Sequence, residues 1–429
     1  MRDQVVRTYL WLLVIALPMD WFGPTGLLLR EAGAKPAIPL MIVSSIAIFA
    51  ARYKGLVTSL PASSGLLLYR FFVIFACGMF AFVLNLILGW SKFGGAKDPL
   101  IQFIGQAALL AITPFVIVCH AELFRDKRWS SYVIDLLPWA ATVHLAALAL
   151  EMAGALASDR LPLSLFRTGS VSFTMRTAGL FSEPSYFGAM AAIYGVPLIV
   201  MSEGRGTVYR RTLAVLLFVA ALITGGKTVI PVAICGFLGA AWYKRARLFT
   251  WRNALAGSVV AAVSFAVVVS RAALDVQSNL SSAMRFGSTL TSLNAAMAGY
   301  GITGVGFGQF HFMFTKKFMP SFLLFSGEAV VQMASSAEHR TSTYNLFSRL
   351  LIESGVMGLV FFLLCMRDIF RWSRQDNTNA SLLGALLIST SLGFLFTQEP
   401  YCYPPLALGA ALVLGARGRG PASFIGEAY

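Results

Sequence analysis

The chain carries little charge and few of the residues that bind metals or form disulfides. Only 12% of its 429 residues are Asp, Glu, Lys or Arg, whereas 57% are hydrophobic. A soluble domain is roughly 25% charged, so this composition excludes an ordinary soluble fold and indicates a polytopic membrane protein. The five cysteines form no close pair, and their spacing predicts neither a metal site nor a disulfide framework.

Common catalytic motifs are also missing. The sequence has no HExxH, GxSxG, Asp-x-Asp or complete phosphate-loop motif, and the lack of Asp-x-Asp argues against an inner-face glycosyltransferase that uses nucleotide sugars. A cleavage site of small residues is absent after the first apolar segment, which follows MRDQVVR. We therefore expect that segment to be a retained anchor rather than a signal peptide.

Long apolar runs are what the sequence has in quantity. Hydropathy predicts an all-α polytopic membrane protein with about twelve spans of about 20 residues each. Their centres fall near residues 15, 44, 78, 110, 142, 190, 216, 234, 262, 355, 388 and 409. The expected divisions are helices one to five (1–153), an outer loop with helices six to nine (154–271), a long outer loop between spans nine and ten (272–342), and helices ten to twelve (343–429).

Basic residues outnumber acidic ones by 34 to 19, and they gather in the joints between apolar runs. This placement favours membrane topology over nucleic-acid binding as the reason for the charge. With the N-terminus inside, seven short inner joints hold nineteen cations: Arg2, Arg7; Arg52, Lys54; Arg125, Lys127, Arg128; Arg205, Arg210, Arg211; Lys244, Arg245, Arg247, Arg252; Arg367, Arg371, Arg374; Arg417, Arg419. We therefore expect both termini on the cytoplasmic side of the membrane.

Two long segments, at about 154–179 and 272–342, are then outside, and loops of that length in a compact protein are usually functional or disordered. The stretch GYGITGVGFGQFHFMF (299–314) mixes glycines with aromatic residues. That composition predicts a packed loop with tight turns or a re-entrant segment. Any chemistry is expected on the outer face.

The first candidate site lies in RTAGLFSEPSYFGAM (176–190). Proline is tolerated in the first turn of a helix, so a helix is expected to begin at Ser182 or Glu183 with Pro184 in that turn. Glu183 is then either a stabilised charge at the positive helix end or a carboxylate that faces an outer cavity, with Arg176 placed to bind phosphate. Both interpretations remain open from the residues alone.

A second candidate is Lys227 in TGGKTVIP (224–231), a tight turn between two spans. Its side chain either reaches the outer interface or binds an anion together with the backbone N–H groups of Gly225 and Gly226. A third is the pair His339 and Arg340, where a base stands beside a cation at the outer surface.

The remaining candidates are weaker. Arg349 and Glu353, four residues apart on one helix, are expected to form a salt bridge, and His144 and Glu151 form a candidate buried pair.

Arg285 is a further candidate phosphate ligand, and Glu399, His311 and Tyr186 are candidate sugar contacts. Aromatic residues are also candidates for stacking on sugars, although core packing is the favoured role for each: Tyr186, Phe187, Phe307, Phe310 and Phe312.

Four segments together resemble the O-antigen ligase and polysaccharide polymerase superfamily: GLFSEPSYFGAM (179–190), TGGKTVIP (224–231), GVGFGQF (304–310) and STYNLFSRLLIESGVMGLVFFLL (342–364). Their order and spacing match over roughly residues 170 to 370, and the likeness is closest to bacterial O-antigen or exopolysaccharide polymerases. The resemblance implies a GT-C-like helical fold and a glycosyltransferase that works on the periplasmic face. The resemblance also implies that the reaction needs no nucleotide, metal or other cofactor.

By this resemblance, the substrate is an oligosaccharide linked to undecaprenyl diphosphate. Arg176 and Arg340 match arginines that hold the diphosphate, and Glu183 matches the acidic residue of the EPS element. A chain-length regulator is a further candidate partner. Stabilising the leaving diphosphate with Arg and Lys and removing a proton from the acceptor hydroxyl suit the residues present.

One position departs from the ligase pattern, and this departure favours a polymerase. Ligases have a His directly before the Asn that opens the tenth-type span, whereas this chain has Tyr344 before Asn345. The general base is therefore left open between His339 and Glu183. A ligase that transfers glycan to lipid A core is the second hypothesis. A transporter of the major facilitator type is the third, disfavoured because the middle inner joint is short.

Overall fold

The computed structural model describes residues 3–19, 35–58, 61–89, 98–158, 180–181, 184–202, 206–226, 228–244, 280–310, 317–321, 343–396, 398 and 400–418. Within these ranges the regular secondary structure is helical and no strand occurs. The all-α prediction is confirmed for this part of the chain.

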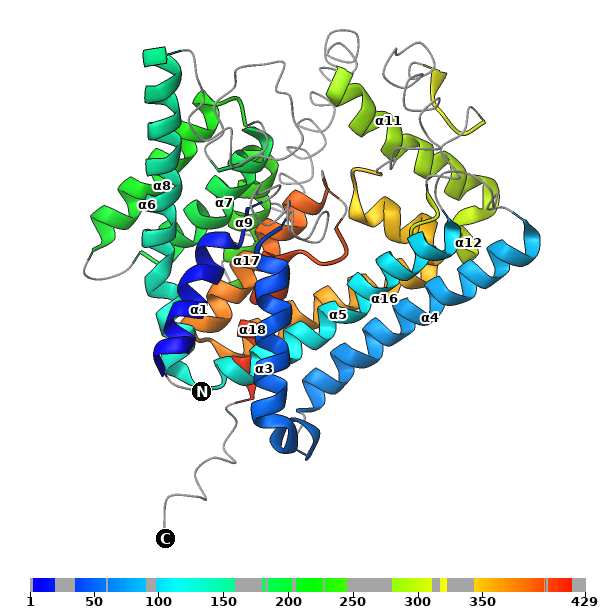
Figure 1. The fold of residues 1–429 in the computed structure, drawn as a ribbon, viewed down its shortest axis with the longest axis horizontal. Coiled ribbons are helices and arrows are strands. Elements are labelled where there is room, and N and C mark those ends of the chain that lie inside the picture. Colours follow the sequence, from blue (N-terminus) through cyan, green and yellow to red (C-terminus); the bar gives the residue numbers. More distant parts are fainter. Residues whose placement is uncertain are drawn as a thin grey trace.

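Long helices account for most of the described chain (Figure 1). Their bounds are α1 (Asp3–Ala16), α3 (Ala37–Thr58), α4 (Ala62–Leu88), α5 (Pro99–Phe124), α6 (Lys127–Ser158), α7 (Pro184–Val200), α8 (Thr207–Ile223), α9 (Val229–Tyr243), α11 (Leu280–Ala295), α16 (Leu346–Asp376), α17 (Asn379–Leu395) and α18 (Pro404–Arg417). Eleven of the twelve predicted span centres fall inside one of these helices, because long apolar runs satisfy their backbone most simply as helices. The centre near 262 lies outside the described residues.

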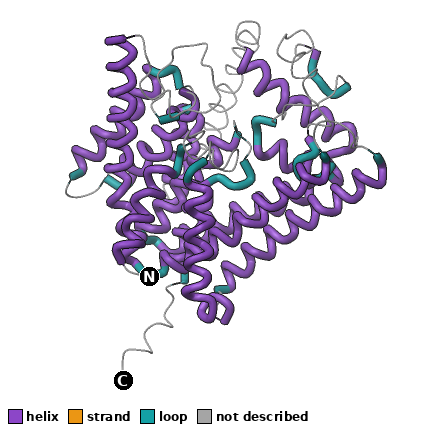
Figure 2. The backbone as a smooth tube through the Cα atoms, in the orientation of Figure 1, coloured by secondary structure: helices purple, strands orange, loops and turns teal. Residues whose placement is uncertain are grey.

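The helices form an upright bundle and an inclined arm (Figures 1 and 2). In the bundle α17 packs against α9, α18 and α7, and α7 also packs against α8. The arm contains α4 and α16, which pack along each other, and α5, which reaches back to α18. Helix α11 lies across the end of the arm opposite the chain termini (Figure 1). The arm and the bundle therefore share α5 and α16 as their connection.

Four helices are long and apolar enough to cross a membrane: Ala62–Leu88, Pro99–Phe124, Lys127–Gly154 and Leu346–Asp376. Shorter apolar helices cover Ala37–Tyr53, Ser185–Val200, Val229–Tyr243, Asn379–Leu395 and Pro404–Arg417. On α4 the large apolar side chains of Phe72 and Ile87 are 66% and 75% exposed, which suits contact with lipid tails. A membrane environment follows from this composition and exposure.

Small residues set the close packing of the bundle. A Cβ added at Gly384 would come within 2.6 Å of the Gly409 carbonyl oxygen, and one added at Gly236 would meet Thr390 at 2.6 Å. These contacts join α17 to α18 and α9 to α17. Because apolar helices gain no hydrophobic advantage from each other in lipid, close backbone approach through small residues is a principal source of their attraction.

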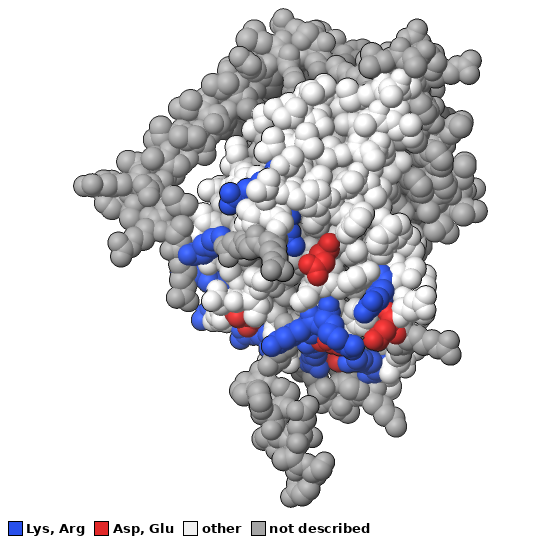
Figure 3. Space-filling model, turned by 90° about the vertical axis from the view of Figure 1, so that its left-hand side faces the viewer, with Lys and Arg blue, Asp and Glu red and all other residues white. Residues whose placement is uncertain are grey.

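Three of the predicted inner joints, at the start of α1, between α5 and α6 and at the end of α18, lie together at the end of the molecule where both described chain ends lie (Figure 1). Arg128 binds Asp3 and Asp126, Arg125 binds Glu122, and a Cβ at Gly418 would contact Arg125. On the face drawn in Figure 3 the described charged residues gather toward this same lower end. We call it the charged end.

The stretch 272–342 contains more structure than the single long loop that was expected. Its described part begins with α11, continues through the π-helix η4 (Ala296–Tyr300) and the short α12 (Gly301–Thr303), and then enters the glycine-rich segment. Helix α11 is tied to the start of α16 by the Thr289 hydroxyl, which donates to Thr343 O at 3.0 Å.

Candidate functional site

Helix α16 is broken at Gly355. This residue has φ 72° and ψ 179°, which is far from helical geometry, and positive φ favours glycine. The break lies nine residues, roughly 14 Å, along the helix from Leu346. It frees the carbonyl groups of Ile352 and Glu353 from the helix, and buried carbonyls need other partners.

The segment Gly304–Phe310 supplies those partners. Val305 N donates to Ile352 O and Gly306 N donates to Glu353 O, both at 2.9 Å. Gly304 has φ 83°, and a Cβ there would come within 2.6 Å of Gly355 N. Gly304 and Gly355 therefore allow the backbone of residues 304–310 to meet the backbone of α16 at the break.

The same segment is fixed by side chains from α4 and α5. Asn85 Nδ2 donates to Val305 O at 2.7 Å, and Gln309 Nε2 donates to Pro99 O at 2.9 Å. Val305, Phe307 and Gln309 are fully buried. For residues 304–310 the prediction of a packed loop is confirmed, and the irregular backbone is surrounded by protein, as a membrane protein requires; residues 311–314 lie outside the described residues.

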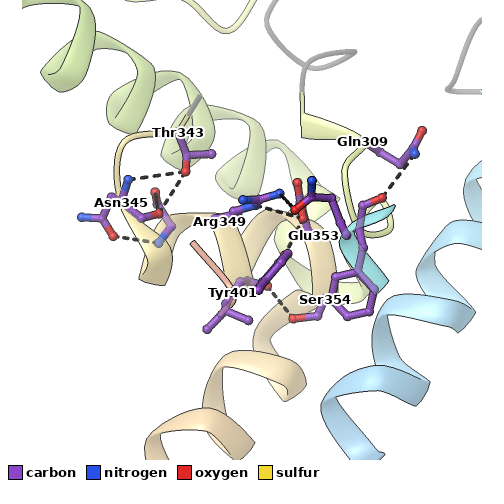
Figure 4. A network of polar contacts seen from close by, with 11 residues as sticks. Gln309, Thr343, Asn345, Arg349, Glu353, Ser354 and Tyr401 are labelled. Atoms are coloured by element: carbon purple, nitrogen blue, oxygen red, sulfur yellow. Dashed lines mark hydrogen bonds and ion pairs between the residues drawn. The ribbon is translucent and has the colours of Figure 1, made fainter. Parts of the chain in front are cut away.

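An ionic network lies beside the break: it contains Arg349, Glu353 and Tyr401 (Figure 4) together with Gln106 of α5. Arg349 Nε is 3.2 Å from Glu353 Oε2, its Nη2 donates to Gln106 Oε1 at 2.9 Å, and its guanidinium lies over the Tyr401 ring at 4.3 Å. The Tyr401 hydroxyl donates to Glu353. The side chains of Arg349 and Glu353 are only 7% and 1% exposed. The predicted Arg349–Glu353 salt bridge is confirmed, and it is a buried one.

Asn345 caps the first turn of α16. Its Oδ1 accepts from Phe347 N at 2.9 Å and Ser348 N at 3.1 Å, while its Nδ2 donates to Phe396 O at 3.2 Å. Tyr344, directly before the cap, has φ 52°, a left-handed conformation that costs a non-glycine residue about 1–3 kcal/mol. Tyr344, the residue at which this chain departs from the ligase pattern, therefore has a backbone conformation that is unusual for a residue other than glycine.

The anion-binding interpretation of the glycines in TGGKTVIP is wrong for their backbone N–H groups. Gly226 N donates to Ala221 O at 2.8 Å and Gly225 N to Leu222 O at 3.1 Å, with Gly225 at φ 75°. This pair of bonds is the Schellman motif that ends α8. Both donors are satisfied by the helix, so the glycines terminate α8. The predicted tight turn between α8 and α9 is confirmed.

Three of the sequence motifs meet at what we call the motif cluster, which consists of Ser185, Tyr186, Thr228, Leu346 and Gln398. The Thr228 hydroxyl donates to Ser185 O. The Tyr186 hydroxyl donates to Gln398 Oε1 at 3.2 Å, and Leu346 N donates to Gln398 O at 3.1 Å. The cluster joins the starts of α7, α9 and α16 to the segment before α18.

Close backbone contact supports this cluster. A Cβ at Gly188 would collide with the Gly226 carbonyl oxygen, so α7 and the α8–α9 turn touch without side chains between them. Helix α7 begins at Pro184, which confirms that this proline belongs to the first turn.

Most of the predicted site residues lie outside the described residues: Arg176, Glu183, Lys227, His311, His339, Arg340 and Glu399. Arg285 is on α11, and its side chain is also outside what the structure describes. Tyr186 is described. Its hydroxyl binds Gln398, and its ring packs edge-on against Phe394 at 5.8 Å, so it connects α7 to the segment before α18.

Other sequence expectations can be placed directly. Phe187, Phe307 and Phe310 are buried, in agreement with core packing, and Phe312 lies outside the described residues. His144 and Glu151 are both buried, but His144 is not paired with Glu151. Its Nε2 donates to Ile15 O at 3.0 Å, and Tyr194 donates to Val14 O. These side chains satisfy the carbonyls at the end of α1, which stops inside the bundle.

Comparison with known proteins adds no assignment: neither the models of known protein families nor the curated proteins include a match to this chain.

Proposed function

We propose that the chain is a membrane glycosyltransferase that polymerises oligosaccharide repeat units carried on undecaprenyl diphosphate. The product is an O-antigen, capsular polysaccharide or exopolysaccharide, made on the periplasmic face of the inner membrane. In this proposal the fold is GT-C-like, has about twelve spans and places both termini in the cytoplasm.

One observation carries the proposal. Segments from four distant parts of the chain, chosen by their resemblance to one superfamily, touch one another in two adjoining sets of contacts. Ser185 and Thr228 join the first two segments, and Leu346 joins them to the fourth through Gln398. Val305 and Gly306 join the third segment to the fourth. Packing of apolar helices alone gives no reason for these four motifs to be neighbours.

The proposed chemistry uses the candidate residues that the sequence singled out. Arg176 and Arg340, with Arg285 and Lys227, stabilise the negative charge of the departing diphosphate. Glu183 or His339 accepts the proton of the attacking sugar hydroxyl. The bond between the anomeric carbon and the diphosphate breaks as the new glycosidic bond forms.

Sugar recognition is assigned to a second set. Glu399 and His311 are proposed sugar contacts, as is Tyr186, whose hydroxyl is already bound to Gln398 at 3.2 Å. We infer that Tyr186 acts at this site by fixing the start of α7 to the segment that carries Glu399, and that any stacking on a sugar uses its ring.

The test is polymer length in cells that carry Arg176→Ala or Arg340→Ala. We expect both variants to accumulate single lipid-linked repeats while the protein remains in the membrane, because the leaving group has lost a cation. Arg371→Gln, a change at the charged end, serves as the control and should leave polymer length unchanged. Polymer of normal length in both arginine variants would sink the proposed diphosphate site.

A ligase is the second candidate, and the two activities differ in what accumulates. Deleting the gene for a polymerase leaves lipid-linked single repeats, whereas deleting the gene for a ligase leaves full-length polymer on the lipid carrier. Tyr344 favours the polymerase because its position holds His in ligases. A transporter is the remaining alternative, and six-plus-six internal symmetry would support it.

A further inference from the structure

A cavity of about 310 Å³ opens at the charged end, away from the proposed active site. It is bounded by α1, α3 and the turn from α5 to α6. Helix α3 leaves helical geometry at Arg52, which has φ −126° and ψ 17°, and Arg52 lines the cavity. A volume of this size is at the lower end of the range found for small-molecule sites.

The cavity has an apolar floor and a charged rim. Val6, Ile48, Leu123 and Trp129 line it and are less than 10% exposed. The rim consists of Asp3, Arg52, Asp126 and Arg128, so it carries two guanidinium groups and two carboxylates. An occupant that carries a single sign of charge would be repelled by one half of this rim.

The rim side chains differ in how many ion pairs and hydrogen bonds they already make. Arg128 is committed, since its Nη2 and Nε lie 2.8 Å and 3.0 Å from Asp126 Oδ2 and its Nη1 is 3.3 Å from Asp3. Arg52, by contrast, makes one ion pair within the described chain, from Nη1 to Glu122 at 3.2 Å. The side chains of Arg52 and Asp3 are 56% and 59% exposed. The Arg52 guanidinium and the Asp3 carboxylate are therefore the two rim groups most accessible to a ligand.

Exposed apolar residues beside the cavity suit a rim at the level of lipid headgroups. On the helices that form the cavity, Val5 of α1 and Val43 and Ile46 of α3 are exposed, and they continue from the charged end into the apolar surface. Basic pockets between membrane helices are known locations for anionic lipid headgroups, and the carboxylates of this rim suit a headgroup that also carries a cation.

We propose that this cavity binds the headgroup of an ethanolamine phospholipid. The phosphate is held by the donors of Arg52, the ammonium by the carboxylate of Asp3, and the acyl chains lie along α1 and α3. The headgroup of phosphatidylglycerol has no cation for a carboxylate to bind. A choline headgroup has a cation but no N–H to donate, so both should bind less well.

The experiment uses the full-length protein, purified in detergent with its affinity tag at the C-terminus. Native mass spectrometry follows the binding of dioleoyl phosphatidylethanolamine, phosphatidylcholine and phosphatidylglycerol in parallel titrations. We expect the ethanolamine lipid to bind at least about tenfold more tightly than either of the others, the effect of one or more charge-assisted hydrogen bonds.

Two variants test the two halves of the rim. Arg52→Gln and Asp3→Asn should each remove the preference for ethanolamine, whereas Arg371→Gln and Asp135→Asn, which change exposed charges outside the cavity, should keep it. Equal binding of the three lipids, tighter binding of phosphatidylglycerol, or a preference that survives both rim variants would overturn the proposal. Because the readout is lipid binding, the result is independent of the proposed transferase activity.

Discussion

At the scale of single residues, the buried ion pair of Arg349 and Glu353 is the most consequential feature. Burying two charges is costly, and their attraction offsets that cost only when further hydrogen bonds satisfy them. Gln106 and Tyr401 provide those bonds. The four side chains therefore depend on one another, and losing one charge leaves the other without compensation.

We expect Glu353→Gln and Arg349→Met each to destabilise the protein by about 3–5 kcal/mol, the usual effect of leaving one buried charge unpaired. The double variant should lose less than the sum, because it buries no lone charge. Thermal unfolding of the purified proteins in detergent measures this difference. Additive losses would show that the two charges are not coupled.

A second residue-scale prediction concerns His144, which donates to Ile15 O at the buried end of α1. His144→Ala should reduce stability by about 1–3 kcal/mol, because it leaves a buried carbonyl without its partner. His144→Gln keeps a donor and should lose less. The same unfolding assay applies, and equal stability of the two variants would contradict the capping role.

At the scale of elements, the interrupted helix α16 organises the site. Its two halves are joined at Gly355, and the backbone of Gly304–Phe310 fills the gap between them. Interrupted membrane helices expose backbone groups where an unbroken helix would hide them, and transporters use such breaks to bind substrates. Here the freed carbonyls serve a structural purpose, because Val305 and Gly306 occupy them.

Gly355→Ala should prevent correct folding or strongly reduce the yield of folded protein. The added Cβ would lie 2.6 Å from Ile302 O, in a backbone conformation at φ 72° that alanine disfavours. Gly105→Ala on α5 is the matched control, since a Cβ there meets nothing within 4 Å. Elution profiles in detergent compare the two, and a well-folded Gly355→Ala protein would refute the break.

The sequence predicted the helices well and their interruptions poorly. Apolar runs mark the helices directly, and the spacing of Arg349 and Glu353 indicated their salt bridge. Gly355 looks like any helical glycine, because contacts with the distant segment 302–304 impose its conformation. Gln106 and Tyr401 lie 243 and 48 residues from their partners in the network, so no local spacing could indicate them. Asn345 did carry a signal, since Asn favours helix N-caps.

At the scale of the whole molecule, charge is distributed unevenly along the bundle. The predicted inner joints share ion pairs at the charged end, as between Arg128 and Asp3, while the motif cluster is assembled at the starts of α7, α9 and α16. The distribution agrees with a fixed orientation in the membrane, in which cations stay on the cytoplasmic side.

Reporter fusions test this orientation. A fluorescent protein fused after Tyr429 should fold and fluoresce, and alkaline phosphatase at the same place should be inactive, because the C-terminus is predicted in the cytoplasm. Fusions at residue 160, in the first predicted outer loop, should give the opposite pattern. Phosphatase activity at the C-terminus would reverse the proposed topology.

The long-range polar contacts also have a consequence for biogenesis. Asn85, Gln106 and Arg70 reside in the early helices α4 and α5, and their partners Val305, Arg349 and Asp368 follow 220, 243 and 298 residues later. At about 5–20 residues per second, the ribosome needs roughly ten seconds to a minute to make them. Over that interval three polar side chains wait in nascent helices without their final partners. The early helices therefore have to be kept out of the lipid, or their polar side chains shielded by the insertion machinery, until the segment with Val305 and helix α16 have been synthesised.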